Sequence, residues 1–148
     1  MSDILAPAVA LMIWTMVMWA WMYATRIPAM QKAKVDVNRL VNDPDASLDR
    51  ELPPQVQWKA HNYNHLHEQP TLFYIVTVIL ALTGPSALDV TLAWVYVALR
   101  IVHSLWQSLV NTIPVRLLIF AIGSIVLTVL AVRAVMATLL ADPSLAPA

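Results

Sequence analysis

Apolar residues fall into four long runs, and most of the polar residues lie between the first two. A helix needs about 20 apolar residues to cross the hydrocarbon layer of a bilayer, and each run approaches that length. The polar connection covers residues 27–55, and short turns join the later runs. The pattern predicts an all-α, integral membrane four-helix up-down bundle, one transmembrane domain over 1–148. The predicted helices are 4–26, 56–82, 90–110 and 114–140.

Prolines mark where these helices bend or begin. Pro70 lies inside the second predicted helix and predicts a kink there, because proline has no amide hydrogen to donate. Pro114 is well placed at the first position of the fourth helix. The first run begins without basic residues and is long, which favours a retained helix over the alternative, a cleaved signal peptide. The tail, 142–148, is expected to fray.

Composition supports the membrane prediction. Of 148 residues, 59% are hydrophobic and 12% are charged, more apolar surface than a soluble domain of this length can hide. The net charge is zero, which argues against nucleic-acid binding. The chain has no cysteine, so disulfides and thiolate metal sites are excluded. It has two glycines, too few for a glycine-rich phosphate loop.

The distribution of basic residues predicts the orientation. The connection between the second and third helices contains Asp89 and no lysine or arginine, whereas Arg116 follows the third connection. By the positive-inside rule, the first and third connections lie in the cytoplasm and both termini lie outside. We expect an integral protein of a bacterial inner membrane. The basic residues of the first connection and its flanks are Arg26, Lys32, Lys34, Arg39, Arg50 and Lys59.

Two polar stripes are predicted inside the bundle, where ionisable groups are costly and are usually functional. The second helix carries His61, Asn64, His65 and Glu68 at the spacing of one helix face. At about 1.5 Å per residue, Glu68 and Arg100 lie at the same depth, and so do His65 and His103. We therefore predict a Glu68–Arg100 ion pair, as part of a ligand site or as a structural clamp. The stripe of the third helix is Arg100, His103, Ser104, Gln107, Ser108 and Asn111.

Other charged residues allow two interpretations each. With Arg26 and Lys59, Arg116 forms a basic mouth suited to an anionic ligand with carboxylates, or it only obeys the positive-inside rule. Arg133 either extends to the outer interface or pairs with Asp89. His61 and His65, with Glu68 and His103, allow a single metal ion as a weaker alternative, and the leading prediction has no metal site. Histidine-box di-iron membrane enzymes have similar local spacing but need many more than four histidines.

Several of these residues together resemble the MAPEG family, the membrane-associated proteins in eicosanoid and glutathione metabolism. Lys59-Ala60-His61 with Glu68, Pro70 and Phe73 resembles the family's Arg-Ala-His…Asn…Glu…Pro-x-x-Phe run. Arg100-Ile101-Val102-His103 resembles its Arg-x-x-His motif. Pro114-Val115-Arg116 resembles its Pro-x-Arg motif. The resemblance covers nearly the whole chain.

The resemblance implies a homotrimer that binds glutathione between neighbouring subunits. Arg116 would be the catalytic residue, stabilising the glutathione thiolate. The chain departs from the family pattern, because an ungapped alignment places Tyr63 and Leu66 where the family has asparagine and glutamate. Leu117 stands where some members have serine. The glutathione-binding residues would be Asn64, Glu68, Arg100, His103, Gln107, Arg26 and Lys59.

The function implied is a membrane-bound, glutathione-dependent transferase or peroxidase acting on lipophilic electrophiles. Glutathione would be the cofactor, and the bilayer would supply the lipophilic co-substrate. The alternative is a non-catalytic MAPEG-like membrane subunit that packs within a larger complex. Three departures favour that alternative: Leu66, Leu117, and Gln107, which stands where several members have tyrosine. The Trp-rich first helix favours it too.

Overall fold

The structure is a computed structural model that describes residues 3–141, and the predicted fraying tail, 142–148, lies outside them. The described residues form seven helices and no strand. The helices are α1 (Leu5–Ala33), α2 (Val37–Asn42), α3 (Leu48–Glu51), α4 (Pro54–His65), α5 (Gln69–Thr83), α6 (Ala87–Leu109) and α7 (Ile113–Thr138). Four spans are long and apolar enough to cross a membrane: α1, α4 with α5, α6 and α7. The all-helical, four-span prediction is confirmed.

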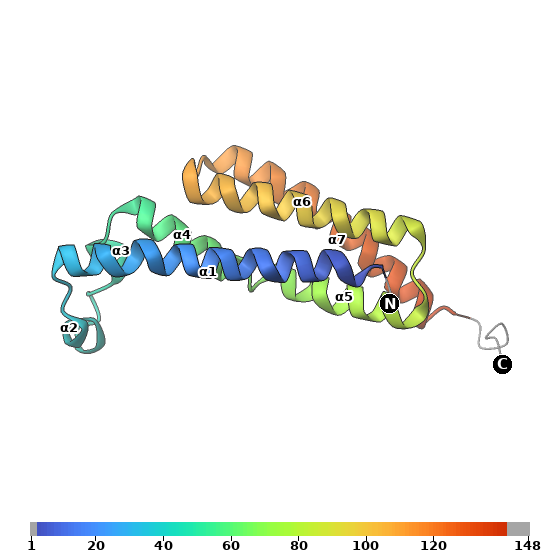
Figure 1. The fold of residues 1–148 in the computed structure, drawn as a ribbon, viewed down its shortest axis with the longest axis horizontal. Coiled ribbons are helices and arrows are strands. Elements are labelled where there is room, and N and C mark those ends of the chain that lie inside the picture. Colours follow the sequence, from blue (N-terminus) through green and yellow to red (C-terminus); the bar gives the residue numbers. More distant parts are fainter. Residues whose placement is uncertain (1–2, 142–148) are drawn as a thin grey trace.

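The spans alternate in direction along one long bundle (Figure 1). From the N-terminal end, α1 runs to the end that carries α2 and α3, α4 and α5 return, α6 goes back, and α7 returns again. Helix α1 packs on α4, α5 and α6, while α7 packs on α5 and α6. Helix α6 therefore lies between α1, α4 and α7, and its buried face is directed toward the interior of the bundle.

Each span buries only a narrow seam. In α1, Leu11 and Met18 are buried one heptad apart, and in α7 Leu127 and Leu130 are fully or almost fully buried. Spacings of three and seven residues are typical of closely packed helices. Large apolar residues on the other faces stay exposed, for example Ile125 at 64%. Since that much exposed apolar surface is unfavourable in water, these faces are suited to lipid.

Helix α1 continues beyond its predicted end at residue 26. It passes Pro28 and ends at Ala33, where Lys34 adopts a left-handed conformation. The Lys34 amide donates to the Gln31 carbonyl at 3.2 Å, which terminates the helix. The Thr25 hydroxyl, about one turn before the proline, donates to the Trp21 carbonyl at 3.0 Å. A proline is thus accommodated inside the helix, and the connection to α4 is shorter than predicted.

The second predicted helix is interrupted rather than only kinked. Helix α4 ends at His65, three residues follow, and α5 begins at Gln69. Pro70 occupies the first turn of α5, where an amide hydrogen would have no helical partner. The prediction of a distortion at Pro70 is confirmed, and its form is a break in the helix within the second span.

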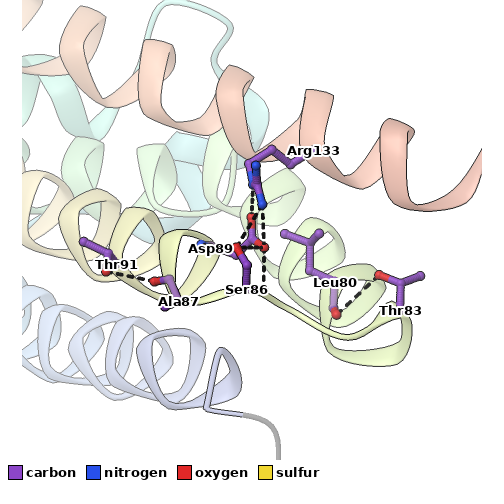
Figure 2. Close-up of polar contacts among 7 residues, drawn as sticks. All are labelled: Leu80, Thr83, Ser86, Ala87, Asp89, Thr91 and Arg133. Atoms are coloured by element: carbon purple, nitrogen blue, oxygen red, sulfur yellow. Dashed lines mark hydrogen bonds and ion pairs between the residues drawn. The ribbon is translucent and has the colours of Figure 1, made fainter. Parts of the chain in front are cut away.

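An ion pair joins the start of α6 to the last turns of α7 (Figure 2). Asp89 is 3% exposed and completes a capping box with Ser86 at the start of α6. Arg133 of α7 donates Nε and Nη2 to the Asp89 carboxylate, and Nη2 also donates to Ser86 Oγ at 2.9 Å. Of the two interpretations of Arg133, the structure shows the ion pair.

We predict that Asp89→Asn lowers the thermal unfolding midpoint of the purified protein clearly. The substitution removes a charge from the pair and leaves Arg133 without its carboxylate. Asp43→Asn is the matched control, because Asp43 also pairs with an arginine, Arg39, but on the exposed surface of α2. Surface pairs contribute little. An equal fall in both variants would contradict a special role for the Asp89 pair.

Candidate functional site

The polar stripes of the second and third spans meet, but on a different face of α4 from the one predicted. Asn62 is 1% exposed and donates Nδ2 to Ser104 Oγ at 2.5 Å. Leu66, one turn later, is also buried against the core. His61, Asn64 and Glu68 of the predicted stripe are exposed. Leu66 lies four residues after Asn62 on the same face of the helix, so burying Leu66 also turns Asn62 inward.

Arg100 is the most deeply buried charge of this region. The residue is 2% exposed, and Nη2 donates to the His65 carbonyl oxygen at 3.1 Å. The same nitrogen lies 3.1 Å from His65 Nδ1, and Cζ lies 5.8 Å from the centre of the Phe120 ring. Because the last carbonyls of a helix carry partial negative charge, Arg100 caps the C-terminus of α4.

The predicted Glu68–Arg100 ion pair is wrong. Glu68 lies in the break between α4 and α5, and 66% of its side chain is exposed. Its carboxylate lies 3.7 Å from His65 Nε2 and not within ion-pair distance of Arg100. The depth calculation assumed an unbroken helix through residue 68, and the chain leaves the helix before that point.

Arg100 therefore keeps hydrogen-bonding capacity inside the protein. Its Nε and Nη1 are buried and have no partner among residues 3–141. Further along α6, Gln107 Oε1 and Ser108 Oγ are also buried and unpartnered. Buried polar atoms without partners are uncommon in native proteins, and bound water or a ligand is the usual explanation. The seam of α6 thus has the character of a binding site.

A small cavity opens beside this seam between α4, α6 and α7. His65 and His103 stack there with ring centres 5.1 Å apart, and the Phe120 ring lies 5.3 Å from His65. Arg116 lines the same cavity and donates Nη1 to Asn111 Oδ1 at 2.7 Å. The volume is about 160 Å³. The lining is His65, His103, Ile113, Arg116, Leu117 and Phe120.

The predicted site residues are thus divided between regions. Arg100, His103, Gln107 and Arg116 lie along the α6–α7 region just described. Arg26 and Asn64 line another cavity, beside α3. Lys59 packs against α1, with Nζ on the Gln55 carbonyl at 2.9 Å and 5.1 Å from the Trp21 ring centre. Glu68 lies in neither group.

Sequence reasoning did not select Asn62 or Phe120 for the site. Leu66 follows Asn62 by four residues on the same helix face, and its need for burial was the available signal for the direction of Asn62. No comparable signal marks Phe120, since an aromatic residue in an apolar run also suits lipid. Within residues 3–141, no group of three or more histidine or acidic side chains gathers as metal ligands. His61 instead pairs with Asp49 at 3.1 Å.

Comparison with known proteins decides the family. The model of the MAPEG family matches residues 4–136, nearly the whole chain. The chain belongs to the MAPEG family. No curated protein and no solved structure gave a significant match. The four apolar spans agree with membership, and this MAPEG protein is an integral membrane protein.

We predict that Arg100→Gln destabilises this MAPEG protein by about 1–3 kcal/mol, because the His65 carbonyl at the end of α4 loses a charged donor. Denaturant unfolding in detergent micelles measures the change. Arg39→Gln is the control, since 64% of the Arg39 side chain is exposed and its partner, Asp43, is a surface residue. No loss in Arg100→Gln relative to this control would show that the cap contributes nothing.

Proposed function

We propose that this MAPEG protein binds glutathione beside Arg100 and conjugates it to lipophilic electrophiles, or uses it to reduce lipophilic peroxides. One observation carries the proposal: Arg100 is buried, and no carboxylate of residues 3–141 lies within ion-pair distance of it. An unpaired charge inside a membrane protein is costly. A carboxylate of glutathione would supply the counter-charge and accept from the two unpartnered donors, Nε and Nη1.

The residues beside Arg100 suit the rest of such a ligand. Gln107 offers a buried carbonyl oxygen to an amide or ammonium donor. His103 and Arg116 line the adjoining cavity, and Arg116 would face the thiol. A cation near a thiol lowers the thiol pKa and increases the reactive thiolate. The thiolate sulfur would then attack the electrophilic carbon while its leaving group departs.

The cavity also supports the proposal of a homotrimer. At about 160 Å³, it is smaller than the roughly 300 Å³ at which ordinary small-molecule sites begin. Ile113 and Leu117 at its edge are 67% and 63% exposed. A neighbouring copy placed against them would enlarge and close the site, as the resemblance to MAPEG members implies.

The proposed orientation places this cavity at the cytoplasmic end of a bacterial inner membrane protein. The basic first connection and Arg116 lie at that end under the positive-inside rule. Glutathione would enter from the cytoplasm, and the bilayer would deliver the lipophilic co-substrate between the helices.

We predict that Arg116→Gln lowers kcat/KM for a chromogenic halonitrobenzene at neutral pH by about tenfold or more, if the lost cation stabilised the thiolate by about 1.4 kcal/mol. Since the thiol pKa then rises, the pH–rate profile should move to higher pH and the rate should partly recover in alkali. The control is Arg50→Gln, at an exposed position in α3. An unchanged profile would exclude Arg116 from thiolate stabilisation.

We also predict that glutathione raises the thermal unfolding midpoint of the wild-type protein and of Arg39→Gln, but has little effect on Arg100→Gln. The reason is that binding to the folded state stabilises it, and Arg100 would hold a carboxylate of the ligand. S-methylglutathione, which has no free thiol, should stabilise the wild type as well. Stabilisation of Arg100→Gln equal to that of the wild type would place glutathione elsewhere.

A non-catalytic subunit is the second candidate function. Its favouring observation is that Glu68 is mostly exposed and forms no ion pair with Arg100, while Leu66, at the family's glutamate position, is packed into the core. Such a protein would show neither turnover with glutathione nor stabilisation by it, and it would copurify with other membrane proteins. The two measurements above therefore separate the candidates.

A further inference from the structure

A further cavity, of about 360 Å³, lies between α5 and α7, and we call it the α5–α7 cavity. It shares no lining residue with the His65–His103 cavity or with the cavity beside α3. None of the residues assigned to glutathione above lines it. Its volume is within the range of ordinary small-molecule sites. The lining is Gln69, Leu72, Val76, Ser124, Leu127, Thr128, Ala131, Val132 and Val135.

One face of α7 lines both this cavity and the His65–His103 cavity. Ile113 and Phe120 belong to the His65–His103 cavity, whereas Ser124 and Ala131 belong to the α5–α7 cavity. The steps along this series are seven, four and seven residues, which return to the same helix face. The two cavities therefore follow one another along α7.

Contacts between the second span and α7 show that the two cavities adjoin. The ring centre of His65 lies 5.3 Å from that of Phe120 in the His65–His103 cavity. One helical turn further along α7, Gln69 Nε2 donates to Ser124 Oγ at 2.8 Å. The Ser124 hydroxyl donates to the Phe120 carbonyl at 2.9 Å, which joins the two linings. Four residues along a helix are about 6 Å, so a ligand of one cavity can extend into the other.

The α5–α7 cavity is polar at the end near His65 and apolar at the other end. Gln69 and Ser124 form the polar end. A primary amide has two N–H groups, and Gln69 uses one of them on Ser124. The other has no partner among residues 3–141, so it can donate to an oxygen of a ligand. Ala131 and Val135 offer only hydrocarbon at the far end. The cavity is thus suited to an amphiphile whose chain points away from His65.

The apolar end of the cavity lies within the hydrocarbon layer. Ala131 follows Arg116 by 15 residues, roughly 22 Å along α7, and no charged residue lies between them. The hydrocarbon core of a bilayer is about 30 Å thick. Leu72 and Val132, at the edge of the cavity, are 57% and 52% exposed, so a chain can enter from the lipid.

We propose that the α5–α7 cavity holds the unbranched hydrocarbon chain of the lipophilic co-substrate, while its reactive end lies beside Arg116. This rests on the glutathione-dependent function proposed above and adds a substrate class: an electrophile at one end of a single chain, such as a long-chain 2-alkenal. A chain gains little free energy by leaving lipid for an equally apolar cavity. The cavity instead fixes the reactive carbon relative to the thiolate, which raises the rate through orientation.

With a 2-alkenal the reaction is an addition without a leaving group. The thiolate sulfur forms a bond to the β-carbon, and the electron pair of the carbon–carbon double bond moves toward the aldehyde to give an enolate. The α-carbon then takes a proton from water. No oxidant or reductant is required.

The test measures kcat/KM with glutathione for a long-chain and a short-chain 2-alkenal in the same detergent. Ala131→Phe fills the cavity, and the long-to-short ratio should fall about tenfold, because the displaced chain no longer orients the reactive carbon. Val132→Phe, at a half-exposed position, narrows the cavity with less strain and should lower the ratio too. The control is Ala121→Phe, which adds the same ring at an exposed position of α7 that lines neither cavity.

Photolabelling measures occupancy of the cavity without turnover. A long-chain fatty alcohol with a diazirine at its far end is photolysed with the full-length protein, and mass spectrometry identifies the labelled peptides. We expect label on the segments of α5 and α7 that line the cavity. Ala131→Phe should lose this label, and Ala121→Phe should keep it.

Several results would overturn the proposal. One is an unchanged long-to-short ratio in both Ala131→Phe and Val132→Phe. Another is suppression of the label by a diacyl phospholipid as effectively as by unlabelled fatty alcohol, since the cavity would then hold any lipid chain. Label that crosslinks two copies would assign the cavity to a subunit interface. If no electrophile is turned over, the proposed function fails, and the label decides separately: its loss in Ala131→Phe supports the chain site, and equal label in both variants overturns it.

Discussion

The contact between Arg100 and the end of α4 is the interaction on which the rest of this structure depends. The second span breaks in mid-course, and a broken helix leaves carbonyl oxygens without partners where water is scarce. From the buried face of α6, Arg100 donates to one of the last carbonyls of α4, that of His65, which otherwise accepts a long hydrogen bond of 3.4 Å from the Glu68 amide. The contact gives the carbonyl at the broken helix end a donor, and it gives the buried guanidinium an acceptor. It also leaves two guanidinium nitrogens, Nε and Nη1, without a partner among residues 3–141, so this structural contact is also the centre of the candidate site.

Lipid replaces water around this bundle, and the distribution of side chains follows from that. Apolar residues gain little by turning inward when the surroundings are equally apolar, so they occupy the outer faces. Polar residues gain more from the interior, because there they find partners. Asn62 and Ser104 bond across the α4–α6 contact, and Asp89 and Arg133 bond across the α6–α7 contact. The buried polar residues therefore align the helices as well as providing chemistry.

Polar residues that are neighbours in the sequence line two different cavities. Asn64 and His65 are adjacent in sequence, yet one lines the cavity beside α3 and the other lines the cavity beside α7. A helix turns by about 100° per residue, so adjacent positions face different neighbours. The polar run at the start of the second span consequently serves two surfaces. One faces the proposed glutathione site beside Arg100, and the other faces the cavity beside α3.

The sequence by itself determined the four spans, the distortion at Pro70 and the polar stripe of α6, because these depend on local composition and on a regular helical repeat. The family motifs at Arg100 and Arg116 could also be recognised from the sequence, since they lie on unbroken helices. The tertiary structure alone decided which face of α4 turns inward, and it replaced the expected Glu68 with His65 as the partner of Arg100. The physical reason is that helical counting holds only while the helix continues. After the break, the direction of Glu68 is set by three residues outside the helix, which no periodic pattern describes.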